Sequence, residues 1–520
     1  MMNENDSPEA AEVLDGGSHE ASSRPPHGPL THITGRSGEG ATPAPPPMYA
    51  RKDAEAQTQD PGDSYEPGGS FSQFIRRSAT VIEQEADSPT ASVLPRQART
   101  LVEVGLSKAF LTDLALKIIH YSGTPSLSQL IRRLGLGAGV VQQLVSVLTE
   151  ESFVEVMSQS DLYTGNYRYR LSDRGSSRAA QALERSRYAG PAPVTAEQYA
   201  EVMRRFLSHK QELSRSRVKT ALSELVISAE VADAVARSLF SGKATLLYGP
   251  SGNGKTSMLE RYANDLDGFS LIPYSIYAYG QTIRVFDQSI HEPLEELDAD
   301  MSGKEDRVDR RWVMVRRPAV VLGAEMGADS LEMAYDPQAR FYQAPPHIKA
   351  QGGVLVIDDF GRQKIPAPDL LTRLLIPLER GWDTLSLVTG EKLTIPFGLQ
   401  LLFGTNIPIR QLADDSLLRR ILYKVEVTGP QVQEFTEILR RLCLQRKVLV
   451  AEGALEYVAQ RIYSESRLKP RASYGRDILE MLLESASFDG REPVLDQQSF
   501  DGVFRLFVSQ EAEEDQSVEA

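Results

Sequence analysis

One stretch of eight residues has the types and the spacing that phosphate binding requires. It reads Gly249-Pro250-Ser251-Gly252-Asn253-Gly254-Lys255-Thr256 and fits the pattern G-x-x-x-x-G-K-[ST] at every fixed position. Glycines permit positive φ angles and leave no Cβ between the backbone and a phosphate group. We expect Lys255 to lie against the β- and γ-phosphates of a nucleoside triphosphate, and the Thr256 hydroxyl to hold Mg²⁺.

The residues on either side of this loop predict the strand and the helix that position it. Residues 244–248 are apolar and rich in β-forming types, which indicates a buried strand. Residues 255–264 place apolar side chains at helical spacing. A strand, a glycine loop and a helix in this order direct backbone N–H groups and a positive dipole end at one point. The expected nucleotide-binding residues are Gly249, Pro250, Ser251, Gly252, Asn253, Gly254, Lys255, Thr256 and Ser257.

A second apolar run ends in two carboxylates. Residues 352–357 read as a strand that is buried on both faces, and Asp358 and Asp359 follow it directly. In nucleotide chemistry, Asp358 is expected to hold Mg²⁺, largely through water, and Asp359 to orient or deprotonate the attacking water. The alternative is a buried strand that runs into an acidic turn without a role in chemistry.

Further polar residues follow in an order that suits the same site. Residues 399–403 predict another buried strand, and the Asn406 amide after it could hold a water against the γ-phosphate. Arg419 and Arg420 precede a last strand at residues 422–427, and Arg471 and Arg476 fall near the start of a helix. Taken singly, each arginine is more simply a solvated charge or a surface ion pair.

Residues 222–507 resemble an AAA+ ATPase. In that resemblance, residues 249–256 match the Walker A motif and residues 354–359 the Walker B motif. Asn406 matches sensor 1, Arg419 and Arg420 match the arginine-finger box, and Arg476, with Arg471 as the alternative, matches sensor 2. The resemblance implies an α/β fold of the P-loop NTPase type, with a five-stranded parallel sheet and a C-terminal helical lid. It also implies ATP and Mg²⁺ as cofactors and a homo-oligomeric ring, usually of six subunits, whose arginine fingers act on the neighbour's ATP.

Two features depart from the usual AAA+ pattern. The Walker B motif ends in Asp-Asp instead of Asp-Glu, which leaves open a slow hydrolysis rate. The interval before Asp358 is about forty residues longer than a minimal module needs. We expect an insertion at about 274–342 that engages substrate, and the alternative is a surface elaboration packed on the sheet. Within it, residues 310–317 and 319–322 predict a hairpin with basic ends.

The first part of the chain divides into an arm and a small domain. Residues 1–98 are rich in Pro, Gly, Ser and Glu and predict a disordered arm. Residues 99–193 predict three short helices and a β-hairpin, which resembles a winged helix of small α+β type. Arginines on the hairpin and the helix after it suit DNA phosphates, but the third helix has few base-reading side chains, so protein docking is the alternative.

The remaining boundaries follow from composition. We predict a linker helix at 194–221, the ATPase core at 222–428, a helical lid at 429–509 and an acidic tail at 510–520. The closest resemblance within the class is to bacterial AAA+ proteins that join an N-terminal winged helix to one ATPase module.

Bulk composition limits where such a protein works. The chain has 520 residues, a net charge of −14 and one cysteine, Cys443, which excludes an internal disulfide framework and a cysteine-based zinc site. The acidic N-terminus does not read as a secretory signal, and the sequence offers no apolar run long enough to span a membrane. We expect a cytoplasmic protein without membrane insertion.

Three functions remain open from the sequence. The leading hypothesis is an AAA+ ATPase that hydrolyses ATP at subunit interfaces to remodel, or drive the assembly of, a protein client. The second is a DNA-associated ATPase or a transcription or replication regulator that binds DNA through residues 99–193. The third is a slow, nucleotide-gated scaffold switch, which the second aspartate of the Walker B motif suggests.

Overall fold

The computed structural model describes residues 93–157, 167–209, 213–294, 308–465 and 470–519. The predicted disordered arm, residues 1–98, therefore lies almost entirely outside the described residues. Its last part is described, and there Val93, Leu94, Gln97 and Ala98 are buried against the folded chain. Among the described helices, none combines the length and the apolar composition that crossing a lipid bilayer requires.

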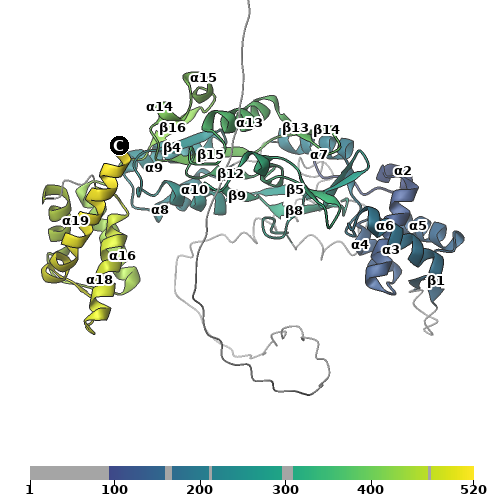
Figure 1. The fold of residues 1–520 in the computed structure, drawn as a ribbon, viewed down its shortest axis with the longest axis horizontal. Coiled ribbons are helices and arrows are strands. Elements are labelled where there is room, and N and C mark those ends of the chain that lie inside the picture. The colour runs from purple at the N-terminus through teal and green to yellow at the C-terminus, as the bar shows by residue number, and fades with distance from the viewer. Residues whose placement is uncertain (1–92, 158–166, 210–212, 295–307, 466–469, 520) are drawn as a thin grey trace, which may run out of the picture. The chain divides into compact units, whose positions relative to one another are not determined.

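A five-stranded parallel sheet forms the centre of the structure (Figure 1). In spatial order its strands are β16 (Tyr423–Glu426), β4 (Thr245–Tyr248), β15 (Gln400–Thr405), β12 (Val354–Ile357) and β9 (Ala319–Leu322). Every neighbouring pair is parallel, which confirms the predicted sheet. Strand β15 separates β4 from β12, so the loops after β4 and β12 meet across the end of a third strand.

Helices cover both faces of this sheet, which explains why its strands read as continuous apolar runs. Val354 and Val356 of β12 pack into the hydrophobic cluster on one face, and Leu355 and Ile357 pack into the cluster on the other. Figure 1 shows the helices of the two faces on opposite sides of the sheet. The first face carries α8 (Arg215–Ser223), α9 (Ala229–Phe240) and α10 (Lys255–Asn264), and the second carries α13 (Ala367–Arg380).

A second, mixed sheet lies beside the core sheet. Its strands, in order, are β10 (Ala334–Asp336), β11 (Phe341–Gln343), β7 (Gln281–Arg284), β6 (Ser275–Ala278) and β3 (Val194–Thr195). The predicted linker helix thus begins as a strand of this sheet and continues as α7 (Ala196–Ser208), whose apolar face is buried. Helix α7 ends at Ser208, and α8 begins at Arg215.

The predicted hairpin with basic ends is wrong. Strand β8 (Trp312–Arg316) pairs antiparallel with β5 (Phe269–Pro273), and β9, which follows β8 after two residues, joins the core sheet beside β12. The direction changes at Pro318, whose carbonyl accepts a hydrogen bond from Val354 N at 2.9 Å. Two adjacent β-forming runs were expected to pair with each other, but each has a better partner elsewhere. The predicted insertion range, 274–342, therefore contains one strand of the core sheet.

Residues 99–193, here called the N-terminal module, have their own hydrophobic core. The elements are α2 (Leu101–Val104), α3 (Lys108–Ser122), α4 (Leu127–Leu134), α5 (Ala138–Glu150), β1 (Val154–Met157), β2 (Arg168–Leu171) and α6 (Asp173–Arg185). Strands β1 and β2 form an antiparallel hairpin in which Val154 faces Leu171. Serine side chains cap α3, α4 and α6 at their N-termini, which is what helix starts of this composition favour.

The chain ends in a helical unit that surrounds a third core. Its helices are α16 (Val432–Arg446), α17 (Ala454–Gln460), a π-helical turn (Arg461–Glu465), α18 (Tyr474–Phe488) and α19 (Gln497–Glu519). A short parallel pair, β17 (Leu449–Val450) with β18 (Val494–Leu495), ties two of the loops together. Helix α19 continues through the residues that were assigned to an acidic tail.

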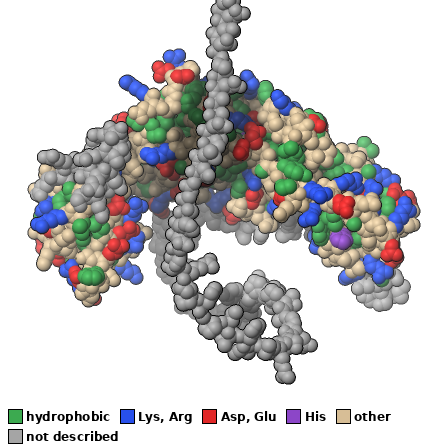
Figure 2. All heavy atoms as spheres, viewed as in Figure 1, with side chains coloured by type: hydrophobic (Ala, Val, Ile, Leu, Met, Phe, Trp, Pro, Cys, Tyr) green, Lys and Arg blue, Asp and Glu red, His purple; other side chains and the backbone are tan. Residues whose placement is uncertain are grey.

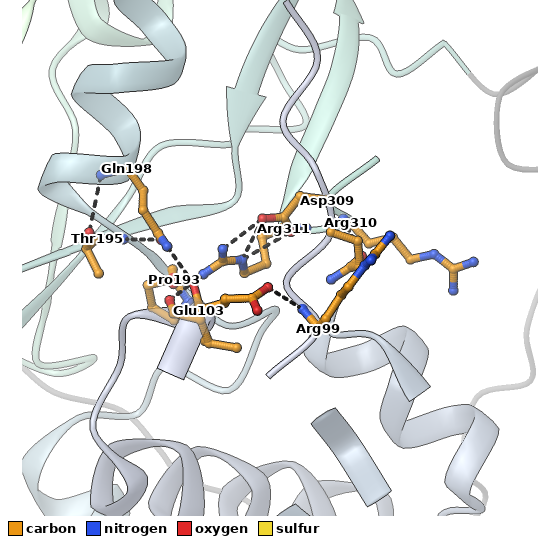
Figure 3. Close-up of polar contacts among 10 residues, drawn as sticks. Arg99, Glu103, Pro193, Thr195, Gln198, Asp309, Arg310 and Arg311 are labelled. Carbon is orange, nitrogen blue, oxygen red and sulfur yellow. Dashed lines mark hydrogen bonds and ion pairs between the residues drawn. The ribbon is translucent and has the colours of Figure 1, made fainter. Parts of the chain in front are cut away.

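A buried arginine, held by a neighbouring aspartate, joins the N-terminal module to the rest of the chain (Figure 3). Arg311 and Asp309 are each 3% exposed, and Arg311 Nη2 donates to Asp309 Oδ2 at 2.7 Å. Arg311 Nη1 also donates to the carbonyl oxygens of Val104, at 3.0 Å, and Pro193, at 3.3 Å. The guanidinium of Arg311 thus binds the carboxylate of Asp309 and also one carbonyl oxygen near each end of the module. We call this contact the joint.

Candidate nucleotide-binding site

The phosphate-loop pattern lies between β4 and α10, as the sequence predicts. Gly249, Gly252 and Gly254 have φ angles of 134°, 78° and 79°, which only glycine adopts without strain. A Cβ on Gly249 would lie 2.4 Å from the carbonyl oxygen of Val427, so that this glycine also allows a close backbone approach. The loop is therefore specified by its glycines, and its N–H groups lie at the start of a ten-residue helix. A loop of this pattern between a strand and a helix of a parallel sheet defines a P-loop α/β fold.

Lys255 lies at the base of the loop and is 8% exposed. Its Nζ donates to the carbonyl oxygens of Gly249, at 2.9 Å, and Pro250, at 2.8 Å. Burial lowers the pKa of the Lys255 amine, while the negative charges of Asp358 and Asp359 act in the opposite direction. The ammonium group thus lies within the loop and near the acid pair, where a phosphate would be met.

Thr256 and Asp358 are in direct contact at the carboxyl ends of β4 and β12. The Thr256 hydroxyl lies 2.9 Å from both carboxylate oxygens of Asp358. Between them lies the end of β15, where a Cβ on Gly404 would come within 2.9 Å of Asp358 Oδ1. The absence of a side chain at Gly404 therefore makes room for the contact.

This pair of oxygen donors fits Mg²⁺. A hydroxyl and one carboxylate side by side are the ligands that Mg²⁺ uses when substrate phosphates and water supply the rest of its coordination. Within the described residues, no cluster of three or more His, Cys, Asp or Glu side chains could hold a metal by itself. The ion that suits these residues is one that arrives with a phosphate.

Asp359 begins the loop after β12 and adopts a positive φ of 48°. Its side chain is exposed, whereas that of Asp358 is half-buried. Gln363, which the sequence reasoning missed, holds this loop, because its Nε2 donates to the carbonyl oxygens of Asp358 at 2.8 Å and Asp359 at 3.2 Å. In turn, Gly361 N donates to Gln363 Oε1 at 2.8 Å. The side-chain amide of Gln363 thus fixes the backbone from which the Asp359 side chain projects.

Asn406 follows β15 and reaches the same edge of the sheet. Its Oδ1 accepts a hydrogen bond from Arg362 Nε at 3.3 Å, which links it to the loop after the acid pair. The Thr405 hydroxyl donates to the carbonyl oxygen of Phe360 at 2.6 Å and fixes the two loops to each other. Arg362 is a further cation at this edge that the sequence reasoning missed. Only its position three residues after Asp359 could have drawn attention to it.

The C-terminal helical unit touches the phosphate loop through the turn before α18. Ser473 N donates to the carbonyl oxygen of Gly252 at 2.8 Å, and Ala472 N donates to Asn253 Oδ1 at 3.1 Å. A cavity of about 480 Å³ opens beside this contact and is lined by Ser251 and by both predicted sensor arginines. These arginines behave differently. Arg471 lies over the ring of Tyr474 at 5.7 Å, whereas the exposed Arg476 pairs with Asp477 at 3.1 Å.

The structure does not bring Arg419 and Arg420 to this chain's own phosphate loop. Both are exposed and follow α15 (Asp415–Leu418), and Arg420 forms an ion pair with Glu379 at the end of α13. The side chain of Arg419 makes no hydrogen bond or ion pair with the described residues. The predicted site residues therefore form two groups, one around Thr256 and one that faces outward near residue 420.

Comparisons with known proteins give one family match and distant structural similarities. A domain of unknown function (DUF8689) matches residues 431–505, which include α16 to α18. No curated protein matches the sequence.

Two of the similar solved structures are NtrX from Brucella abortus in complex with ATP and the Holliday junction branch migration motor RuvB from Thermotoga maritima. For NtrX, the identity is 13%, the TM-score is 0.33, and the match covers 63% of this chain and 62% of NtrX. For RuvB, the identity is 16%, the TM-score is 0.30, and the coverage is 56% and 70%. This chain thus spans less than two thirds of the length of the NtrX chain that it matches.

We predict that Gly252→Ala weakens nucleotide binding more than Gly254→Ala does. The two glycines have the same φ within a degree, so the backbone strain is equal, but only a Cβ on Gly252 meets the C-terminal unit, at 2.5 Å from Ser473 Oγ. Overpacking of this kind costs about 1–3 kcal/mol, or roughly a tenfold loss of affinity. Titration of a fluorescent ATP analogue measures both variants.

The double variant Gly252→Ala/Ser473→Gly serves as the control. The second substitution removes the hydroxymethyl group that clashes with the new Cβ and keeps the backbone N–H of residue 473, which binds the loop. The double variant should therefore recover part of the lost affinity. Equal affinities for Gly252→Ala and Gly254→Ala would show that the turn before α18 has no influence on the loop.

Proposed function

We propose that this chain is an ATP-binding AAA+ ATPase that hydrolyses ATP at subunit interfaces to remodel a protein client or drive its assembly. The observation that supports this most is the contact between the Thr256 hydroxyl and the Asp358 carboxylate at 2.9 Å. The contact joins a complete phosphate loop to the acid pair at one edge of a five-stranded parallel sheet. A hydroxyl, a carboxylate and a buried lysine in this arrangement suit a magnesium-bound triphosphate.

The binding step follows from the loop and its helix. The N–H groups at the start of α10 donate hydrogen bonds to the phosphate oxygens, and Lys255 exchanges its two carbonyl acceptors for phosphate oxygens. Thr256 and Asp358 hold Mg²⁺, which neutralises charge on the phosphate oxygens when it is bound. The hydrogen bond from the Thr256 hydroxyl to the Asp358 carboxylate already holds these oxygen ligands next to each other.

In the hydrolytic step, Asp359 and Asn406 position the attacking water. Asp359 is exposed on a fixed loop, so that its carboxylate can orient or deprotonate a water without a large desolvation cost. Asn406 lies at the end of the neighbouring strand and is held by Arg362. Both residues occupy the carboxyl edge of the sheet, where the γ-phosphate would end.

The positions of Arg419 and Arg420 support a shared site in an oligomer. They face outward, and Arg420 is paired with Glu379 of α13 instead of a residue of the phosphate loop. An arginine that lies away from the phosphate loop of its own chain is available to stabilise the charge that develops on the ATP of a neighbouring subunit. We infer a homo-oligomer, with a six-membered ring as the arrangement that the AAA+ class favours.

The C-terminal helical unit acts as the lid of the site in this proposal. Its turn before α18 binds the phosphate loop through the N–H groups of Ser473 and Ala472. A loop that moves when phosphate is bound or released therefore moves this unit as well. Arg471 and Arg476 line the cavity between the two, and Arg476 is the candidate that can leave its exposed partner Asp477 for a phosphate.

A protein client is favoured over DNA by the pairing of the arginines in the N-terminal module. Arg178 and Arg185 both bind Asp113, and Arg170 binds Glu155, which reduces the positive charge available to a polyanion. On the face seen in Figure 2, basic and acidic side chains are interspersed over the module. If residues 99–193 are a winged helix, these contacts suit protein docking better than phosphate binding.

We predict that Thr256→Val strongly lowers magnesium-dependent ATP hydrolysis and that Thr256→Ser retains most of it. Valine has the shape of threonine without the hydroxyl that binds Asp358, and serine keeps that hydroxyl. Loss of one ligand at a magnesium-phosphate site should lower kcat by about a hundredfold. Phosphate release is measured over a range of Mg²⁺ concentrations. Equal rates for the two variants would refute the assignment of Thr256 as a metal ligand.

We predict that Asp359→Asn keeps ATP binding within about twofold but lowers turnover by about a hundredfold or more. Asparagine tolerates a positive φ as well as aspartate does, so that the variant removes the charge without straining the loop. Asp359→Glu keeps a carboxylate and should retain measurable turnover. Should all three proteins hydrolyse ATP equally fast, Asp359 is not the residue that activates water.

We predict a non-additive result when Arg420→Ala and Lys255→Ala subunits are mixed. Each variant alone should be inactive, the first for lack of a finger and the second for lack of phosphate binding. A mixed ring contains interfaces that join an intact phosphate loop to an intact arginine, so that activity should reappear. Turnover is measured against the mixing ratio, with Arg410→Ala as the matched surface control. Activity that stays at zero at every ratio argues against shared sites.

A further inference from the structure

A second cavity, of about 300 Å³, lies next to the joint and contains none of the phosphate-loop residues. Its walls come from four parts of the chain: residues 97–99, Ile131 of α4, the start of α5, and Arg310 just before β8. The joint residues Asp309 and Arg311 stand directly before and directly after Arg310 in the sequence. Anything bound in this cavity would contact the N-terminal module and the second part of the molecule together.

The start of α5 offers backbone donors to this cavity. The helix has 13 residues, its N-cap is Gly137, and no side chain caps it. The first helical bond runs from Val141 N to Gly137 O, so that the N–H groups of Ala138, Gly139 and Val140 have no acceptor within the helix. Ala138, Gly139 and Val140 all line the cavity, and a Cβ on Gly139 would meet no atom within 4 Å.

A buried side chain provides a second, independent donor. Gln97 lines the cavity and is 5% exposed, and its Oε1 accepts from Arg310 N at 3.1 Å. Its Nε2 has no hydrogen-bond partner among the residues that the structure describes. The side chain lies against the helix start, since its Cγ is 3.5 Å from the position a Cβ on Gly137 would take. A buried amide without an acceptor is costly, and a small movement of the Gln97 side chain toward the cavity would let a bound anion supply one.

Two arginines give the cavity its positive charge. Arg99 and Arg310 both line it, and within the described ranges neither guanidinium forms an ion pair. Figure 3 shows both on the same side of the joint, away from the guanidinium of Arg311. The nearby carboxylate of Glu103 accepts from Arg99 N and from the Thr100 hydroxyl, and Glu103 does not line the cavity.

We propose that this cavity is a binding site for the phosphate group of a small molecule. Backbone N–H groups, an amide and two guanidinium groups are all donors, so that the ligand must be an anion with several acceptor oxygens. Inorganic phosphate and a small phosphomonoester share this chemistry. A bound phosphate links Arg310 to α5 and Gln97 and so strengthens the attachment of the N-terminal module at the joint.

The test is isothermal titration calorimetry on the full chain carrying Lys255→Ala, which removes phosphate binding by the phosphate loop. The titrants are inorganic phosphate and phenyl phosphate. Gly139→Asp places a carboxylate at the start of α5, where it satisfies the helix dipole and repels the ligand, and Gly139→Asn is the matched neutral control. We expect Gly139→Asp to weaken binding at least about tenfold and Gly139→Asn to change it less than about threefold.

Arg310→Gln removes one guanidinium and should also weaken binding about tenfold. Tighter binding of inorganic phosphate supports the free ion as ligand, and tighter binding of phenyl phosphate supports a monoester. Absence of phosphate binding, or equal affinities for the Asp and Asn variants, overturns the proposal. The proposal is also overturned if neither small titrant binds but a short DNA duplex does, and if Gly139→Asp abolishes that DNA binding. These outcomes leave the ATPase proposal untouched, since every protein in the test lacks Lys255.

Discussion

The contact between Thr256 and Asp358 depends on the order of strands in the core sheet. Their strands, β4 and β12, are not neighbours, so the two loops can meet only across the end of β15. A Cβ on Gly404 would come within 2.9 Å of Asp358 Oδ1 and would crowd the contact. The sheet therefore brings the phosphate loop, the acid pair and Asn406 to one edge, and the glycine in the middle strand leaves room for Asp358 to reach Thr256. Any chemistry at this edge requires that arrangement first.

The sequence predicted those parts of the fold in which the local pattern and the tertiary environment agree. Strand β12 is buried on both faces, and for that reason its four residues are all apolar and readable as a strand. The phosphate loop is equally local, because its glycines, lysine and threonine are adjacent in the chain. Pairing partners are a different matter. Strands β8 and β9 lie two residues apart and were expected to form a hairpin, but their partners, β5 and β12, are set by the packing of the whole sheet.

The same distinction separates the predicted site residues from the missed ones. Lys255, Thr256 and Asp358 belong to short motifs, and the structure brings them together. Gln363 and Arg362 act on the site through side-chain bonds whose geometry depends on a loop with a positive φ at Asp359, which no residue pattern announces. The contact of Ser473 with Gly252 joins residues more than 200 positions apart. Such contacts could be found only in the folded chain, because they arise from the docking of one domain on another.

The two ends of the chain are attached to the core in ways that suit different tasks. The C-terminal unit is bound to the phosphate loop by backbone hydrogen bonds near the surface, each worth about 1 kcal/mol, so that a nucleotide can rearrange them. The N-terminal module is held by two buried hydrogen bonds from Arg311 to the carbonyl oxygens of Val104 and Pro193, and Asp309 fixes that guanidinium in place. Hydrogen bonds from a charged donor contribute about 1.5–3 kcal/mol each. In the ATPase that we propose, binding energy at the loop would move the C-terminal unit first. The more firmly held N-terminal module would stay in place as the docking surface for the proposed client.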